Sequence, residues 1–147
     1  RWHGRQGRDG SAYTWGMVLD DDDHPDRDRL VGLLSLGGIQ YGSVLSGSIG
    51  YWIDRREAGR GLTPTAVAMA TDWAFRSAGL HRVEVNIRPE NAASLRVVAK
   101  LGLRDEGLRR AYLHVDGAWR DHRTFAVTAE EVPDGLLARW LATRPRP

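Results

Sequence analysis

The feature that most restricts the fold is a helical segment flanked by two strand-like segments near the middle of the chain. Ser48–Asp54 and Arg82–Arg88 both alternate apolar and polar residues, which is typical of half-buried strands. Between them, apolar residues recur at helical spacing around Val67, Ala70 and Ala74. A strand, a helix and a second strand in this order favour a right-handed crossover that joins parallel strands. We therefore expect a mixed sheet.

Two helices carry recognisable end signals. Thr63 is a good N-cap for the first helix, Pro64 suits its first helical position, and Gly79 lies where a C-terminal cap belongs. The second helix is expected over Asn91–Leu101, capped by its first residue and ended by Gly102. These signals give two helices of ordinary length, one before and one after the strand that separates them.

The remaining segments add strands before this unit and a hairpin after it. Asp116-Gly117 is the strongest short hairpin signal, and it joins two β-rich runs within Leu103–Thr128. Arg1–Ser11 is polar and is expected to be a loop or the frayed end of a helix. We further expect two early strands, at Tyr13–Asp20 and Arg29–Ser35, and a glycine- and serine-rich stretch from there to Gly47. A short C-terminal helix is expected at Pro133–Thr143. This order indicates a single domain of the α/β (α+β) class.

The composition excludes several classes of protein. The 147 residues are 41% hydrophobic, and no apolar run reaches the roughly 18 residues that a membrane-spanning helix needs. The absence of cysteine excludes disulfides, cysteine-ligated zinc and thiol nucleophiles, and it favours a cytoplasmic setting. The 21 basic and 19 acidic residues give a net charge of +2 without the basic block typical of nucleic-acid-binding arms. We expect neither membrane nor direct nucleic-acid binding.

An acidic run at Asp20–Asp26 contains clustered carboxylates and a histidine, which could ligate a hard cation. The alternative is a solvated hairpin loop, because Pro25 blocks a strand and the like charges repel one another. The spacing and the glycine of an EF-hand are both lacking. We expect the loop, and no metal site.

The glycine loop, Arg56–Gly61, lies between the third strand and the first helix. Gly59 and Gly61 let the backbone approach a ligand closely, while a helix start offers unpaired N–H groups and a positive dipole end. Such a loop suits a pyrophosphate, with Arg56 and Arg60 as charge partners. It matches neither a Walker A loop nor the dinucleotide-binding Gly-x-Gly-x-x-Gly, and alone it also fits a plain turn between strand and helix.

Three ordered motifs resemble the GNAT N-acetyltransferase superfamily over about Tyr13–Val132. The first, Arg56-x-x-Gly59-x-Gly61, resembles the acetyl-CoA loop of the superfamily, and the second, Arg88–Leu103, resembles its second signature motif. The third, Glu106–His122, resembles the closing hairpin of the RimJ/RimL branch. That branch acetylates N-terminal amines of ribosomal proteins. The resemblance implies a GNAT-like, mostly antiparallel twisted sheet with helices on both faces. Family members usually carry more elements before the Tyr13 strand, so we expect residues 1–147 to be one GNAT-like domain without its N-terminal strand and helix.

The resemblance also implies a site for acetyl-CoA. In this superfamily the strands corresponding to Ser48–Asp54 and Arg82–Arg88 splay apart, and the pantetheine arm of coenzyme A lies between them. The strand backbone would bind the pantetheine and polarise the thioester carbonyl, and the glycine loop would bind the pyrophosphate. The residues expected to bind the donor are Trp52, Ile53, Arg56, Glu57, Ala58, Gly59, Arg60, Gly61, Thr63, Asn91 and Ser94.

Two residues are candidates for catalysis under this resemblance. Ser94 lies three residues beyond Asn91, so its hydroxyl is expected to meet the departing thiolate. Some relatives place a glutamate where this chain has Asn86, which cannot accept a proton. Glu84 projects from the same strand face and is the candidate base. Alternatively, Asn91 is only a helix cap, Ser94 a polar first-turn residue and Glu84 a carboxylate of the sheet surface.

These expectations describe an acetyl-CoA-dependent N-acetyltransferase. Without cysteine there is no cysteinyl acyl-enzyme, which favours direct attack of the amine on the bound thioester. The expected acceptor is a protein N-terminal amine, and the resemblance is compatible with a homodimer. Two alternatives share the donor site: an enzyme that acetylates a small amine such as a polyamine or antibiotic, and a non-catalytic acyl-CoA-binding module.

Overall fold

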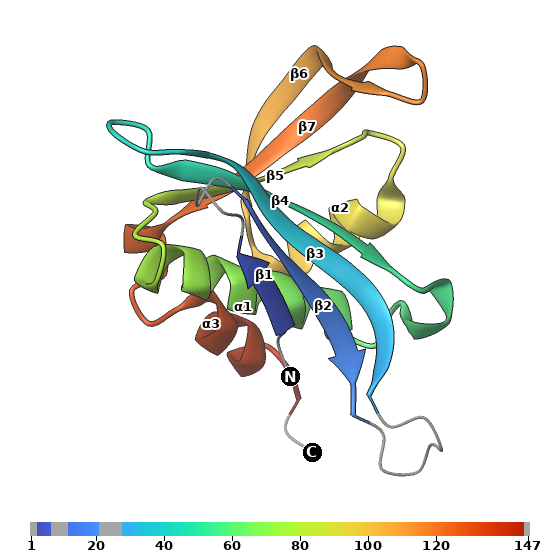
Figure 1. The fold of residues 1–147 in the computed structure, drawn as a ribbon, viewed down its shortest axis with the longest axis vertical. Coiled ribbons are helices and arrows are strands. Elements are labelled where there is room, and N and C mark those ends of the chain that lie inside the picture. Colours follow the sequence, from blue (N-terminus) through green and yellow to red (C-terminus); the bar gives the residue numbers. More distant parts are fainter. Residues whose placement is uncertain (1–2, 7–11, 21–27, 146–147) are drawn as a thin grey trace.

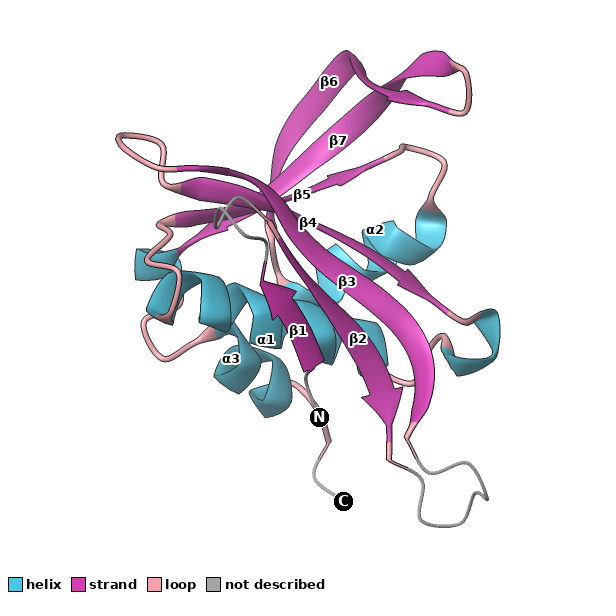
Figure 2. Ribbon diagram, viewed as in Figure 1, coloured by secondary structure: helices cyan, strands magenta, loops and turns pink. Residues whose placement is uncertain are grey.

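The structure is a computed structural model that describes residues 3–6, 12–20 and 28–145. Its strands form one sheet in the order β1-β2-β3-β4-β5-β7-β6 (Figures 1 and 2). Neighbouring strands are antiparallel except β4 and β5, which are parallel, so the predicted mixed sheet is confirmed. The strands are β1 (His3–Gln6), β2 (Tyr13–Leu19), β3 (Arg29–Gln40), β4 (Ser46–Ile53), β5 (Arg82–Ile87), β6 (Arg104–Val115) and β7 (Ala118–Thr128).

The helices of the described chain form one layer on one face of the sheet (Figure 2). They are α1 (Leu62–Arg76), α2 (Ala92–Leu101) and α3 (Leu136–Ala142), and short 3-10 helices occur at Arg55–Glu57 and Ala129–Glu131. The three α-helices contact one another, and α1 also packs on β3, β4 and β5. The expectation of helices on both faces is therefore wrong for the described residues. Strands β3 and β4 are joined by a short turn, and Leu33 and Trp52 remain exposed on the opposite face.

The core lies between the sheet and this helical layer. Alternate residues of β3, β4, β5 and β7 point inward, as the pattern of Val83, Val85 and Ile87 predicts. Helix α1 covers them mainly with small or branched side chains. The most deeply buried apolar residues include Leu34, Leu36, Ile49, Val67, Ala68, Ala74, Val83, Val85, Val98, Leu101, Val127 and Leu136.

A buried carboxylate fixes α3 against α1. The Oδ1 of Asp72 accepts a hydrogen bond of 2.7 Å from the N–H of Leu136, and its Oδ2 accepts one of 3.1 Å from Leu137. These N–H groups belong to the first turn of α3, where no earlier carbonyl can pair with them. A negative charge at a helix start also interacts favourably with the helix dipole. Asp72 therefore caps a helix that is distant in sequence.

The ends of α1 differ from the sequence prediction. The helix begins at Leu62 and its N-cap is Gly61, so Thr63 is not the cap and Pro64 occupies the third helical position. Gly61 has φ +79°, a left-handed conformation that favours glycine, and the hydroxyl of Thr65 bonds to its carbonyl. At the other end the C-cap is Ser77 rather than Gly79.

Two strands also differ from the sequence prediction. Strand β3 extends to Gln40, well beyond Ser35, because an irregularity between Gly37 and Gln40 lets pairing with β4 continue through the glycine-rich stretch. Residues 3–6 form the edge strand β1 instead of a loop or frayed helix, while residues 1–2 and 7–11 lie outside the described chain.

Other local predictions are confirmed. Helix α2 begins after its cap Asn91 and ends at Gly102, which is left-handed. Asp116 and Gly117 join β6 to β7 with φ of +50° and +79°, as a two-residue hairpin turn requires. The C-terminal helix is present as α3.

Most of the acidic run, residues 21–26, lies outside the described residues, so its assignment as a loop stays a prediction. In the described ranges, no three or more histidine or carboxylate side chains are grouped so that they could hold a metal ion. None of the helices there is long and apolar enough to cross a membrane.

Candidate functional site

Strands β4 and β5 separate part of the way along their length. They are paired only at Ser46, Gly47 and Ser48 of β4, which face residues 82–84 of β5. Beyond Ser48, β4 continues to Ile53 without a partner on this side. Its other side remains paired with β3 as far as Ile53. The sheet therefore opens on the side where α1 and α2 begin, as the superfamily resemblance implies.

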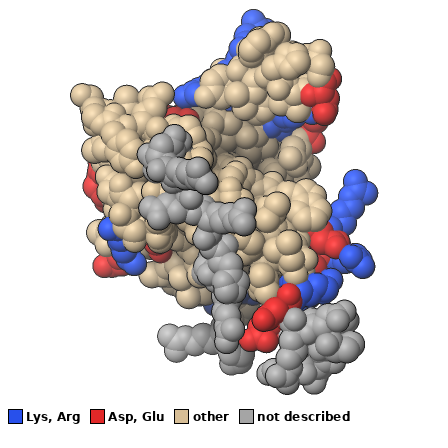
Figure 3. All heavy atoms as spheres, in the orientation of Figure 1, with Lys and Arg blue, Asp and Glu red and all other residues tan. Residues whose placement is uncertain are grey.

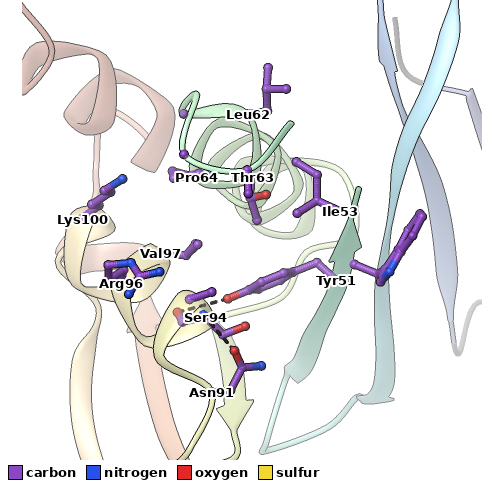
Figure 4. A pocket seen from close by; sticks show the side chains of 15 residues that line it. Tyr51, Ile53, Leu62, Thr63, Pro64, Asn91, Ser94, Arg96, Val97 and Lys100 are labelled. Atoms are coloured by element: carbon purple, nitrogen blue, oxygen red, sulfur yellow. Dashed lines mark hydrogen bonds between the residues drawn. The ribbon is translucent and has the colours of Figure 1, made fainter. Parts of the chain in front are cut away.

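A pocket of about 260 Å³ lies at this opening. Figure 4 shows that the end of β4, the start of α1 and one side of α2 surround it. We call it the interstrand pocket and define it by its lining residues: Tyr51, Trp52, Ile53, Ala58, Gly59, Gly61, Leu62, Thr63, Pro64, Asn91, Ala93, Ser94, Arg96, Val97 and Lys100. Eight of the eleven predicted donor-binding residues belong to this set; Arg56, Glu57 and Arg60 do not.

The backbone at the start of α1 offers several hydrogen-bond donors to this pocket. Gly59 and Gly61 both adopt left-handed conformations, with φ of +80° and +79°. The N–H groups of residues 59–63 have no hydrogen-bond acceptor among the described residues. Consecutive free N–H groups at a helix start form a positively polarised surface that suits a phosphate or pyrophosphate. Glycine at residue 59 leaves open space, because nothing lies within 4 Å of an added Cβ.

The two arginines of the glycine loop bind carboxylates of this chain. Arg56 forms an ion pair with Asp54, with 2.7 Å between Nη2 and Oδ2. The hydrogen bond from the Arg56 side chain lowers the pKa of Asp54 to about 2. Arg60 pairs with Glu57, a buried carboxylate that also binds Arg29. These pairs stabilise the loop conformation. The role of Arg56 and Arg60 as phosphate partners stays a prediction.

The cations that line the interstrand pocket come from α2 instead. Ala93, Arg96, Val97 and Lys100 follow one another at helical spacing and present one side of α2 to the pocket. Figure 4 shows Arg96 and Lys100 beside the pocket. Neither takes part in an ion pair with another described residue. Sequence reasoning missed them, although their spacing of four residues on a capped helix was a usable signal.

The start of α2 is connected to β4 across the pocket. The Oδ1 of Asn91 accepts a hydrogen bond of 3.2 Å from the N–H of Ser94, which confirms the predicted cap. The phenol of Tyr51 donates a hydrogen bond of 3.3 Å to the carbonyl of Ser94 (Figure 4). Burial raises the pKa of Tyr51 above its usual value, so the phenol stays protonated at neutral pH. Sequence reasoning also missed Tyr51, which alternation places on the same face as Ile49.

Glu84 and Asn86 lie on the sheet face opposite the helices, outside the interstrand pocket. Oε1 of Glu84 accepts hydrogen bonds of 2.9 Å from Arg82 and 3.4 Å from Arg109. Asn86 donates to the hydroxyl of Ser48 at 3.0 Å and accepts from Thr124 at 2.7 Å. The structure thus brings Ser94 and Asn91 together at the pocket, and it places Glu84 in a cluster of ion pairs.

Charged side chains on the face seen in Figure 3 gather mainly at the β6–β7 hairpin and at the lower end of the sheet. Between these two regions, the described atoms that are visible in Figure 3 belong mostly to uncharged residues.

Comparison with known proteins gives a consistent set of relatives. The family profile described as "Acetyltransferase (GNAT) domain" matches residues 1–104. The probable N-acetyltransferase YjcK of Bacillus subtilis is 38% identical over 115 residues, which are 78% of this chain and 61% of YjcK. The [ribosomal protein uS5]-alanine N-acetyltransferase of Escherichia coli is 31% identical over 140 residues, 91% of this chain and 70% of that enzyme.

Solved structures agree with these relatives. RimJ of Mycobacterium smegmatis, in complex with CoA-disulfide, has a TM-score of 0.82 and 41% identity, over 92% of this chain and 61% of RimJ. The ribosomal-protein-S5-alanine acetyltransferase of Vibrio fischeri has a TM-score of 0.71 and 30% identity, over 82% of this chain and 63% of that chain. Spermidine N-acetyltransferase structures from Vibrio cholerae, 21% identical with a TM-score of 0.70 in one case, share the fold alone. The chain thus spans about three fifths of YjcK and RimJ.

Proposed function

The chain belongs to the GNAT acetyltransferase family, and from this premise we propose that it transfers an acetyl group from acetyl-CoA directly to a primary amine. The observation that carries the proposal is the opening between β4 and β5 beside the free N–H groups of residues 59–63. A coenzyme A thioester is long and carries a diphosphate near its middle. It therefore suits a slot with a row of N–H donors at one end.

Each part of the donor has its own residues in the interstrand pocket under this function. The N–H groups of residues 59–63 bind the diphosphate, and Arg96 and Lys100 add positive charge. The unpaired side of β4 at Trp52 and Ile53 binds the pantetheine arm, with the amide of Asn91 across from it. A backbone N–H of β4 stabilises the oxygen of the thioester carbonyl as negative charge develops there.

Ser94 completes this assignment. The side chains of Asn91 and Tyr51 form hydrogen bonds with its backbone, and Ser94 lines the interstrand pocket. We propose that its hydroxyl donates a proton to the thiolate of coenzyme A as that thiolate leaves. A thiol has an ordinary pKa of roughly 8.5, so at neutral pH this assistance accelerates the reaction only modestly. Asn91 therefore has two roles in the proposal, as the cap of α2 and as a ligand of the donor.

For the acceptor we propose a protein N-terminal amine of the ribosomal-protein type. Support comes from the uS5-alanine acetyltransferases, which are 30–31% identical to this chain. An α-amine has a pKa of about 7.7–8.0, against about 10.4 for a lysine amine, so a larger fraction of it is neutral and reactive near pH 7. The proposed setting is the cytoplasm, and we propose a homodimer as the assembly.

Two measurements test this function. Calorimetry with acetyl-CoA should show binding, and its absence would contradict the donor site. Thiol release should then be followed with peptides that begin with alanine, with the same peptides acetylated at the N-terminus, and with spermidine and an aminoglycoside. The proposal expects release only with the free peptide amine. A response to the small amines alone would instead support the small-molecule alternative, and binding without any release would support a non-catalytic module.

A further inference from the structure

A row of polar side chains crosses the sheet on the face opposite the helices. Thr124 of β7 donates to Asn86 of β5, and Asn86 donates to Ser48 of β4. Ser48 is the last β4 residue paired with β5, so the row ends where the sheet opens. Thr124 is only 2% exposed although no described helix covers this face. The row therefore marks a partly covered polar surface behind the interstrand pocket.

His122 lies on β7, two residues from Thr124 and on the same face. Pairing between β5 and β7 ends at Ile87 and Arg123, which places His122 just past the end of β5, on the side where the strands diverge. His122 is only 5% exposed to solvent. The structure thus puts an imidazole next to the polar row, at the open end of the sheet.

The hydrogen bonding of His122 determines which ring nitrogen is basic. Nδ1 lies 3.0 Å from the carbonyl oxygen of Arg120. A carbonyl can only accept, so Nδ1 carries the hydrogen and Nε2 of the neutral ring keeps its lone pair. Nε2 has no hydrogen-bond partner among the residues that the structure describes. A ring held in one tautomer, with its basic nitrogen unengaged, can accept a proton from a group that approaches Nε2.

The groups around His122 are mostly cationic or aromatic. The ring of Tyr112 on β6 packs against it edge to face at 6.2 Å between centroids, and Arg109 lies over that tyrosine at 4.7 Å. Arg109 is also the cross-strand neighbour of His122, and Arg88 follows directly after Ile87, the last β5 residue that pairs with β7. The nearest acidic residue in sequence, Asp121, alternates to the other face and accepts from the N–H of Ala111.

We propose that Nε2 of His122 is the general base that removes the proton from the acceptor amine. This role rests on the proposed function. As the amine nitrogen bonds to the thioester carbon, its proton passes to Nε2 and the carbon–sulfur bond breaks. The thiolate takes a proton from the hydroxyl of Ser94, which regains one from solvent as the protonated imidazole releases its own to solvent. Glu84, the base expected from the sequence, is instead held in ion pairs with Arg82 and Arg109.

Two substitutions separate this role from a structural one. His122→Asn keeps an N–H donor near the carbonyl of Arg120 and removes the basic nitrogen, whereas His122→Gln places an amide near Nε2. Both should lower kcat/KM for an alanine-initiated peptide by about 100-fold or more while the Kd for acetyl-CoA stays within about twofold. His114→Gln, on the exposed hairpin, is the matched control and should leave kcat/KM unchanged.

The pH profile gives a readout that a structural role would not move. At a pH low enough for both the amine and the base to be mainly protonated, the wild-type log(kcat/KM) should rise with a slope of about 2, because both must lose a proton. In either His122 variant the slope should be about 1. The inference is overturned if His122→Asn keeps activity within about threefold, or if Glu84→Gln alone removes one unit of slope. A wild-type chain that binds acetyl-CoA and acetylates no amine overturns the proposed function, and this inference with it.

Discussion

Replacing Gly59 tests the proposed diphosphate site at its centre. Gly59 has φ +80°, and an added Cβ meets no atom within 4 Å, so a side chain there enters open space beside the free N–H groups. Gly59→Ala adds only the strain of a left-handed backbone, about 1–2 kcal/mol. Gly59→Glu adds the same strain together with a negative charge close to the diphosphate.

The expected loss of affinity for acetyl-CoA follows from the repulsion between the new carboxylate and the diphosphate. Two unit charges about 5 Å apart repel by about 3 kcal/mol at an effective dielectric constant of 20, and the diphosphate carries two charges. Gly59→Glu should therefore raise the Kd for acetyl-CoA by at least about 100-fold, measured by calorimetry at low and high salt. Gly59→Lys has a side chain of similar length and the opposite charge, so its affinity should fall by less than about tenfold.

Gly79 provides the matched control. Its φ is +70° and its added Cβ also meets nothing within 4 Å, yet it lies beyond the C-terminal end of α1 and outside the interstrand pocket. Gly79→Glu should lower thermal stability about as much as Gly59→Glu and leave the Kd unchanged. Equal Kd values for Gly59→Glu and the wild-type chain would refute the reasoning.

Four further predictions follow from the described contacts. Ser94→Ala should lower kcat by about tenfold with an unchanged Kd for acetyl-CoA, and an unchanged kcat in steady-state assays would remove its proposed role. Lys100→Glu should raise the KM for acetyl-CoA by about tenfold at low salt and by less at high salt; a salt-independent KM would count against a phosphate contact. Asp72→Ala should reduce the free energy of unfolding in urea by about 2 kcal/mol, since two N–H groups at the start of α3 lose their acceptor. Hydrogen bonds from Arg82 lower the pKa of Glu106 to about 2, from a usual value of 4.5. The ionised Glu106 therefore stabilises the folded chain above about pH 4.5, and this stabilisation is lost as the pH falls toward 2. The difference in the free energy of unfolding in urea between the wild-type chain and Glu106→Gln should shrink over that range.

Local sequence signals predicted much of the fold because they act over a few residues. The cap at Asn91, the stop at Gly102, the alternation of Arg82–Arg88 and the Asp116-Gly117 turn each depend on neighbouring groups, and all are confirmed. The start of α1 was misplaced because Gly61, in a left-handed conformation and without a side-chain cap, precedes the first helical residue, whereas the sequence signals used were a capping side chain and a proline.

The site was predicted less completely, for a related reason. The glycine loop and the start of α2 were found because glycines and a cap are visible in the sequence. Arg56 and Arg60 form ion pairs with Asp54 and Glu57, which are only two or three residues away, so their role as phosphate partners stays a prediction. Tyr51 needed the tertiary structure, because its partner is 43 residues distant.

The central claim is that the N–H groups of residues 59–63 bind the diphosphate of coenzyme A. Amide chemical shifts of the ¹⁵N-labelled chain, recorded during a titration with coenzyme A and separately with pantetheine, measure this directly. We predict downfield shifts at Gly59, Arg60, Gly61, Leu62 and Thr63 with coenzyme A and none there with pantetheine, which lacks the diphosphate. Shifts that cluster elsewhere with coenzyme A, or the same response to both compounds, would contradict the account.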